Sequence, residues 1–332
     1  MGDVLLSTPV VEAMRDKFPE AYIAFMVRPE WKDAVKNNPY LDEVILYDKY
    51  GAQKGFLSTV RFALGLKKKK FDTGIALHPT NRVHIMMFVA GIPVRIGYDR
   101  NLPFLLTERA PHRKQEGEKH EADYNFDMLN SAGIHITRSA RKPYMVTDEN
   151  EKRQVDSVLK DAGLGEKIIA VHAGASCPSK RWPPERFAEA ADVLGERCGC
   201  EIALIGGSET EEFSKKVMST MKRRAHDLTG MFLVGELAEF LSRCKMLISN
   251  DSGPVHVSVA VGTPAVVIFG RNIPGLSPRR WGPLGERDKV LHTDKGCEIC
   301  LAHNCTREFR CLKAITPEDV IRAATEVIEE RR

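Results

Sequence analysis

The stretch LISNDSGPVHVSV, residues 247–259, decides the fold. It begins with apolar residues typical of a buried strand, turns polar over four residues, and then resumes an apolar pattern with helical spacing. A buried strand that ends in polar residues just before a helix is typical of a parallel α/β sheet. The stretch therefore predicts a strand at 246–249 and a helix at 253–261, with polar side chains at the carboxyl end of the strand.

The same alternation of short apolar runs and helical patterns continues in both halves of the chain. KIIAVH (167–172) and PAVVIF (264–269) are strand patterns in the second half, and 22–27 and 73–77 are strand patterns in the first. We predict two α/β domains with parallel sheets, an N-terminal domain at 1–148 and a C-terminal domain at 149–332. Ligands of such sheets bind beyond the carboxyl ends of the strands.

The composition excludes several classes of protein. Of 332 residues, 49 are basic and 45 acidic, and this balance does not favour nucleic acid as a partner. No apolar run reaches the roughly 18 residues of a transmembrane helix, and no signal peptide pattern opens the chain. The lysine run 67–70 is interpreted as a solvated helix end, with attraction to an anionic membrane surface as the alternative.

Asp251, Ser252 and Gly253 stand where the helix of the quoted stretch begins. A helix N-terminus presents unpaired N–H groups and a positive dipole end, which suit a phosphate. Gly253 would let the phosphate approach, while Ser252 and His256, about one turn further on, would donate hydrogen bonds. The alternative is that Asp251 or Ser252 only caps the helix.

A second loop of the same kind follows the strand at 167–172. Its small residues, which include Ser176, would let a ligand approach the backbone, and Lys180 would supply a point charge for phosphate. Two such loops on one sheet edge favour a diphosphate ligand. Basic residues on loops usually face solvent, which is the alternative for Lys180.

Asp3 stands just ahead of an amphipathic pattern that predicts one helix over 3–18. As a functional group it would be a carboxylate at the mouth of the N-terminal domain, and the alternative is an N-cap. No strand pattern precedes it, which is unusual for a Rossmann-like domain.

Four cysteines, Cys297, Cys300, Cys305 and Cys311, fall within 15 residues. A four-cysteine zinc site is physically allowed, and an iron–sulfur site is a related option. The spacing is irregular compared with paired C-x2-C motifs, so we favour a structural loop with free or paired thiols.

Four segments together resemble a known family. GDVLLSTPVVEAMRDKFP (2–19), AGIPVRIGYDR (90–100), HAGASCPSKRWPPERFAEAAD (172–192) and LISNDSGPVHVSVAVGTPAVVIFG (247–270) look like signature segments of the ADP-heptose:lipopolysaccharide heptosyltransferases, glycosyltransferase family nine. They occur in the family's order and span nearly the whole chain.

The resemblance implies the GT-B fold, in which two Rossmann-like domains face a cleft and the C-terminal helix can pack back on the N-terminal domain. It implies an inverting transferase that moves heptose from ADP-heptose to the inner core of lipopolysaccharide and needs no metal. It also implies a cytoplasmic location, peripheral to the inner membrane, where the acceptor lies.

The resemblance further assigns roles to single residues. Asp3 matches the proposed general base, and Lys180 matches a lysine that binds the donor phosphates. The motif from Asp251 through Ser252 and Gly253 to His256 matches the family's motif around the diphosphate and ribose. Glu236 lies near the position of a ribose-binding glutamate.

The chain departs from the family in two respects, and one of them is the loop from His172 to Lys180, whose length differs among members. Members begin with a strand ahead of the Gly-Asp pair, whereas this sequence begins at Met1, so we expect the first sheet to lack its central strand. Two other functions stay open at this point: a GT-B sugar-nucleotide epimerase, and a non-catalytic nucleotide-sugar-binding protein.

Overall fold

The computed structural model describes residues 1–136, 142–297 and 300–330. The chain divides into two compact units, one made of 7–141 and the other of 1–6 with 142–332. Residues 1–6 and 142–148, which we assigned to the N-terminal domain, thus group with the C-terminal unit. The different functions expected of the two domains stay predictions.

A six-stranded parallel sheet forms the centre of the C-terminal unit, in the order β11-β10-β9-β6-β7-β8. The strands are β6 (Ile168–His172), β7 (Glu201–Leu204), β8 (His226–Asp227), β9 (Met246–Asn250), β10 (Ala265–Phe269) and β11 (Lys289–His292). Every residue of β6, β9 and β10 is buried, as expected for parallel strands with both faces covered.

Helices cover both faces of this sheet. The longer ones are α6 (Glu149–Ala162), α7 (Pro184–Cys198), α8 (Glu211–Thr220), α9 (Val234–Arg243), α10 (Gly253–Ala260) and α13 (Pro317–Glu329). The shorter ones are α1 (Gly2–Leu5), α11 (Pro278–Trp281), α12 (Arg310–Lys313), and the 3-10 turns η4 (Pro178–Lys180), η5 (Ser208–Thr210), η6 (Pro274–Leu276) and η7 (Ala302–Asn304).

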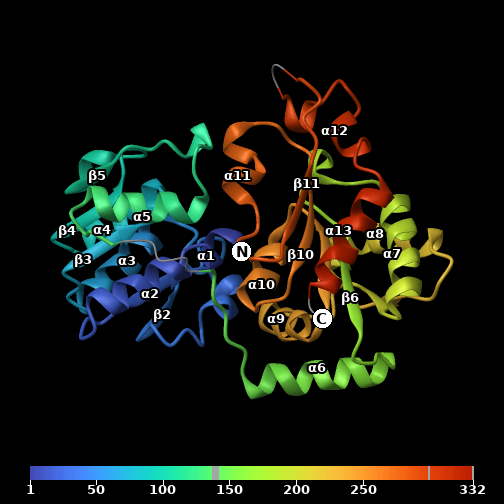
Figure 1. Ribbon diagram of the computed structural model, residues 1–332. Coiled ribbons are helices and arrows are strands. Elements are labelled where there is room, and N and C mark those ends of the chain that lie inside the picture. The colour runs from blue at the N-terminus through green and yellow to red at the C-terminus, as the bar shows by residue number, and fades with distance from the viewer. Residues whose placement is uncertain (137–141, 298–299, 331–332) are drawn as a thin grey trace. The chain divides into compact units, whose positions relative to one another are not determined.

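The C-terminal helix α13 belongs to the C-terminal unit, where it lies beside α7 and covers β9, β10 and β11 (Figure 1). That it packs back on the N-terminal domain stays a prediction. Its apolar face, which includes Val320, Ala324 and Val327, belongs to the same buried cluster as Trp182 and Phe187. The helix begins as its sequence predicts, because Thr316 caps it by accepting a hydrogen bond from the N–H of Asp319.

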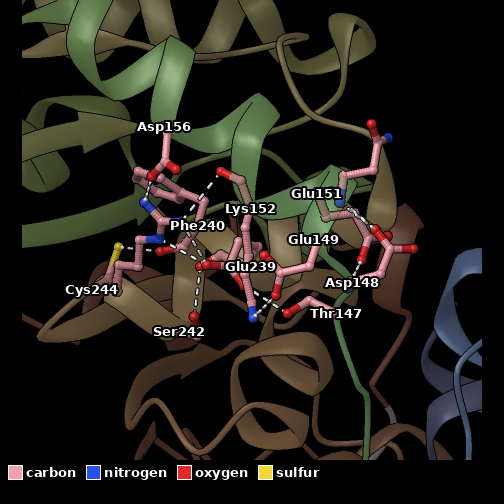
Figure 2. Close-up of polar contacts among 12 residues, drawn as sticks. Thr147, Asp148, Glu149, Glu151, Lys152, Asp156, Glu239, Phe240, Ser242 and Cys244 are labelled. Atoms are coloured by element: carbon pink, nitrogen blue, oxygen red, sulfur yellow. Dashed lines mark hydrogen bonds and ion pairs between the residues drawn. The ribbon is translucent and has the colours of Figure 1, made fainter.

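The helix α6 is fastened to α9 by polar contacts, which Figure 2 shows. Its first turn is a reciprocal cap, in which Asp148 accepts from the N–H of Glu151 and Glu151 accepts from the N–H of Asp148. Buried Glu239 of α9 accepts from the Thr147 hydroxyl and pairs with Arg243, and Arg243 also pairs with Asp156 of α6. This network holds α6, the first long helix after residue 142, against α9 of the same unit.

The N-terminal unit is also α/β. Its helices are α2 (Thr8–Lys17), α3 (Phe56–Lys67), α4 (Asn81–Val89) and α5 (Glu121–Ser131), with the 3-10 turns η1 (Pro29–Ala34), η2 (Pro103–Leu105) and η3 (Lys114–Glu116). Its strands are β1 (Ala24–Val27), β2 (Glu43–Leu46), β3 (Thr73–Ala76), β4 (Val94–Tyr98) and β5 (Glu108–Ala110).

The strands of this unit form two separate parallel sheets, β1-β2 and β3-β4-β5, within the described residues. The expectation that the first sheet lacks a central strand stays a prediction. Most residues of β1, β2 and β3 are only half-buried, unlike the central strands of the C-terminal unit. The two sheets are connected through packing, since Met26 of β1 joins a cluster with Ala63 of α3 and Met86 of α4.

The helix predicted over 3–18 is wrong as a single element. The chain forms α1 and then α2, with Leu6 and Ser7 between the two helices. Pro9 is at the start of α2, where its missing N–H is tolerated, whereas in mid-helix the ring would clash with the preceding turn. The break lets Gly2–Leu5 pack on α10.

No helix in the described part of the chain is long and apolar enough to cross a membrane.

Candidate functional site

The strand order of the C-terminal unit reverses between β6 and β9. From β6 the chain builds outward through β7 and β8, and from β9 it builds the opposite way through β10 and β11. His172 at the end of β6 is in register with Ser249 near the end of β9. Loops after two such strands diverge and leave room for a ligand, so this edge is the expected binding position.

Buried polar side chains fill the base of this edge. The His172 Nδ1 atom lies 3.0 Å from the Ser252 hydroxyl and 3.4 Å from the Ser249 hydroxyl. Burial lowers the pKa of His172 to about 4, so the imidazole is neutral at pH 7. Ser252 therefore pairs with His172 instead of capping α10 with its side chain.

Asn250 holds both ends of the loop between β6 and α7. Its amide nitrogen donates to the carbonyl of Ala173, 2.7 Å away, and its amide oxygen accepts from the N–H of Trp182 at 3.0 Å. Arg181 also donates to the carbonyl of Ala175. Lys180 lies in this loop, between Ala175 and Trp182, which these hydrogen bonds hold. The hydrogen bonds therefore fix the position of Lys180 at the sheet edge.

Three charged residues meet above the strand ends. Lys180 Nζ lies 3.0 Å from Asp251 Oδ2, and an Arg271 guanidinium nitrogen lies 2.8 Å from the same oxygen. Asp251 and Arg271 are buried, and Lys180 is 18% exposed. Two cations share one carboxylate, so the cluster keeps a net positive charge, and Lys180 is its solvent-accessible member.

The N-terminus of α10 adjoins this cluster and is contacted by α1. A Cβ atom added to Gly253 would lie 2.4 Å from the Met1 methyl group, and one added to Gly2 would lie 2.7 Å from the His256 ring. The glycines therefore let the two helices approach closely. Asp3 follows Gly2 on α1 and is exposed, while His256 is buried.

The remaining donor-binding candidates lie on other loops. Ser176 is exposed on the loop after β6. Glu236 is in the first turn of α9, where its carboxylate accepts from the N–H of Leu233 at 2.8 Å, so the structure gives it a capping contact.

The sequence reasoning missed two residues, Arg271 and His172. Arg271 follows β10 by two residues, and a basic residue so soon after a buried strand was the available signal. The sequence predicts His172 as the last residue of a strand, but its burial beside two serines depends on the pairing of β6 with β9.

The four clustered cysteines line one cavity of about 210 Å³ between β10, β11 and the loop before α12. Burial, together with the nearby thiols of Cys300 and Cys305, raises the pKa of Cys311. Within residues 1–136, 142–297 and 300–330, no three His, Cys, Asp or Glu side chains are arranged to hold a metal ion. Zinc binding by this loop therefore stays a prediction.

The geometry suits the binding of an anion. The α10 N-terminus supplies a positive dipole end, and Lys180 and Arg271 supply full charges in a partly desolvated position, where electrostatic interactions are stronger than in water. These groups together match the needs of a diphosphate, whose charge grows when it departs as a leaving group.

A family model described as glycosyltransferase family 9 (heptosyltransferase) matches residues 59–309. A crystal structure of a family 9 glycosyltransferase from Veillonella parvula has a TM-score of 0.90 and 29% identity, covering 99% of this chain and 95% of that one. The structure of ADP-heptose lipopolysaccharide heptosyltransferase II from Escherichia coli has a TM-score of 0.78 and 20% identity, covering 98% and 95%. Lipooligosaccharide heptosyltransferase 2 from Campylobacter jejuni is 24% identical, with 99% of this chain and 96% of that protein aligned.

Proposed function

The chain belongs to glycosyltransferase family 9, the heptosyltransferases, and from this premise we propose that it transfers heptose from ADP-heptose to the inner core of lipopolysaccharide. The observation that carries the proposal is the pair of cations, Lys180 and Arg271, on Asp251 at the switch point of the sheet. The relatives named for heptose transfer to lipopolysaccharide or lipooligosaccharide support the same substrates.

In the proposed reaction, an acceptor hydroxyl oxygen attacks the anomeric carbon of the donor from the side opposite the diphosphate. A carbon–oxygen bond forms, the bond to the diphosphate breaks, and ADP departs with the electron pair, so the anomeric configuration inverts. The hydroxyl proton passes to a base, for which we propose the exposed carboxylate of Asp3. Asp3 lies on the short helix that packs against α10, beside the proposed donor site.

Stabilisation of the leaving group falls to Lys180 and to the N-terminus of α10. Arg271 is the more buried partner of Asp251 and can keep that carboxylate paired when Lys180 turns to the diphosphate. Because these groups supply the positive charge, we propose that transfer needs no metal ion. Ser252 would donate to a phosphate oxygen, with its hydroxyl oriented by His172.

The alternative functions are not favoured. The family model and the curated relative from Campylobacter jejuni are those of transferases, so neither a sugar-nucleotide epimerase nor a non-catalytic nucleotide-sugar-binding protein gains support from them. We further propose that the protein works at the inner face of the membrane that carries its acceptor.

The proposal is tested by incubating the full chain with ADP-heptose and a heptose-deficient lipopolysaccharide core. Wild-type protein should form the heptosylated product, and ADP should bind more tightly than UDP or GDP in calorimetric titration. Asp3→Asn should lower the turnover by about 10² to 10⁴-fold, the usual contribution of a general base, and leave ADP affinity unchanged.

Asp161→Asn is the matched control, because Asp161 is also an exposed helical aspartate and belongs to α6. Full turnover of Asp3→Asn would show that another group is the base. A wild-type chain that binds ADP but transfers no heptose to this core would refute the proposed acceptor, and one that binds no nucleotide would refute the donor site.

A further inference from the structure

The helix α3 leaves large apolar side chains in solvent. Its inner face is buried through Thr59 and Ala63, whereas Phe56, Leu57 and Leu64 are 66%, 82% and 50% exposed. Leu57 and Leu64 lie two helical turns apart on one stripe, on which Arg61 and Lys68 also lie. We call the exposed set Phe56, Leu57, Arg61, Leu64, Lys67 and Lys68 the outer face of α3. Figure 1 labels the helix itself.

The sequence around this face is strongly basic. Residues 49–70 contain seven Lys or Arg and no Asp or Glu, although the whole chain has a net charge of only +4. The rest of the chain is therefore net negative, and the positive charge is concentrated here. Lys69 pairs with Glu43, whereas Lys67 and Lys68 are exposed at the C-terminal end of the helix, where the dipole favours cations.

The loop ahead of α3 is held firmly and adds an exposed aromatic ring. The Asp48 carboxylate accepts hydrogen bonds from the N–H groups of Tyr50, Gly51 and Ala52. Arg82 of α4 donates to three carbonyls of the same loop. These hydrogen bonds hold the backbone of the loop, and the Tyr50 side chain that it carries is 65% exposed. The Lys49 ammonium lies 4.8 Å from the centre of the Tyr50 ring.

From this combination we propose that the outer face of α3 docks on the surface of an anionic lipid bilayer. Helices that lie in the membrane interface carry Phe and Leu flanked by Lys and Arg, because apolar side chains enter the acyl boundary while cations remain with the headgroups. Each Lys or Arg near an anionic surface adds to the attraction. A protein partner fits less well, because lysine is depleted from the cores of protein interfaces.

The inference extends the proposed function, because a lipid-anchored acceptor would be presented at such a surface. It does not depend on that function for its test, since binding to vesicles requires neither donor nor acceptor. A failure of docking and a failure of heptose transfer are therefore separate results.

The experiment measures the partition coefficient of the full chain in a sedimentation assay. The vesicles contain phosphatidylcholine mixed with phosphatidylglycerol, or phosphatidylcholine alone. Wild-type protein should bind the anionic vesicles and not the zwitterionic ones. Replacing Lys67 and Lys68 together by Gln should lower the coefficient by about 30-fold. Replacing Leu57 and Leu64 together by Ser should lower it by about tenfold.

The controls carry substitutions of the same kinds in the C-terminal unit. Leu233→Ser removes another exposed leucine, and a pair of Lys160→Gln and Lys222→Gln removes two exposed lysines of the C-terminal unit. Both should bind anionic vesicles like the wild type. Circular dichroism should show that all variants are folded, as expected when only exposed side chains change.

Three results would overturn the inference. The first is no binding of wild-type protein to anionic vesicles, and the second is equal binding to both vesicle types. The third is an oligomer in light scattering that dissociates when Leu57 and Leu64 are changed, because the outer face would then be an interface between copies of the chain.

Discussion

Replacing Lys180 or Arg271 by Met should have different effects. We expect Lys180→Met to weaken mainly the binding of ADP, and Arg271→Met to lower mainly the free energy of unfolding. Both cations contact the same oxygen of Asp251, but Arg271 is buried and Lys180 is partly open to solvent. Removing one partner of a buried ion pair costs about 3–5 kcal/mol of unfolding free energy. Because Lys180 still pairs with Asp251 after the loss of Arg271, we expect about 3 kcal/mol for Arg271→Met.

Lys180→Met should behave differently. The buried Asp251–Arg271 pair remains intact, so the unfolding free energy should fall by only about 1 kcal/mol. The loss of a charge-assisted contact to the donor diphosphate should cost about 1.5–3 kcal/mol of binding energy, which is about 10 to 150-fold in the dissociation constant for ADP.

Urea unfolding and calorimetric titration with ADP measure the two quantities. Fluorescence of fully buried Trp182 reports on the unit that holds the cluster. Lys245→Met is the control, because Lys245 is half-buried just ahead of β9, at the other end of the strand. The reasoning is refuted when Lys180→Met binds ADP like the wild type and loses as much stability as Arg271→Met.

Three further predictions concern the same edge of the sheet. Gly253→Ala should cost less than about 1 kcal/mol of stability in urea unfolding, since the new methyl group meets only the flexible end of Met1. The free energy of unfolding should fall by about 3 kcal/mol as the pH drops from about 6.5 to about 4, because the unfolded chain protonates His172 while the folded chain keeps it neutral. In urea titrations at several pH values, His172→Gln should remove this contribution to the pH dependence of the free energy of unfolding. EDTA should leave ADP affinity and heptose transfer unchanged, and a metal-dependent loss of either would contradict the proposed role of Lys180 in charge stabilisation.

Local patterns were sufficient to predict the elements that carry the site. The stretch 247–259 forms β9 and α10 within one residue or so of the predicted limits, because an apolar run, polar residues and a glycine specify the junction locally. The sequence also predicted Lys180 and Asp251 as site residues, and they lie 3.0 Å apart. Their roles in binding a donor stay predictions.

Features that depend on contacts between residues far apart in the sequence could not be predicted from local patterns. Arg271 joins Asp251 only because β10 pairs with β9, and no local pattern reports which strands become neighbours. The break between α1 and α2 follows from Pro9 and from packing on α10, which outweigh a continuous helical pattern. The sequence analysis does not predict the helix α6, although Asp148 and Glu151 have the spacing of a reciprocal cap, because the predicted domain boundary falls at residue 148.

Because the N-terminal unit has two separate sheets, we expect its resistance to deformation to be lower between the sheets than within each sheet. A hydrogen-bonded ladder resists sliding because its bonds must break together, whereas packed side chains yield more locally. In the described residues no ladder joins β1 to β3, so force passes between them through helix packing such as that of Ala63 on Met86. A force applied to α3, such as that from a surface on which it docks, would therefore reach β3, β4 and β5 through side-chain packing. It would not pass along a continuous hydrogen-bonded sheet.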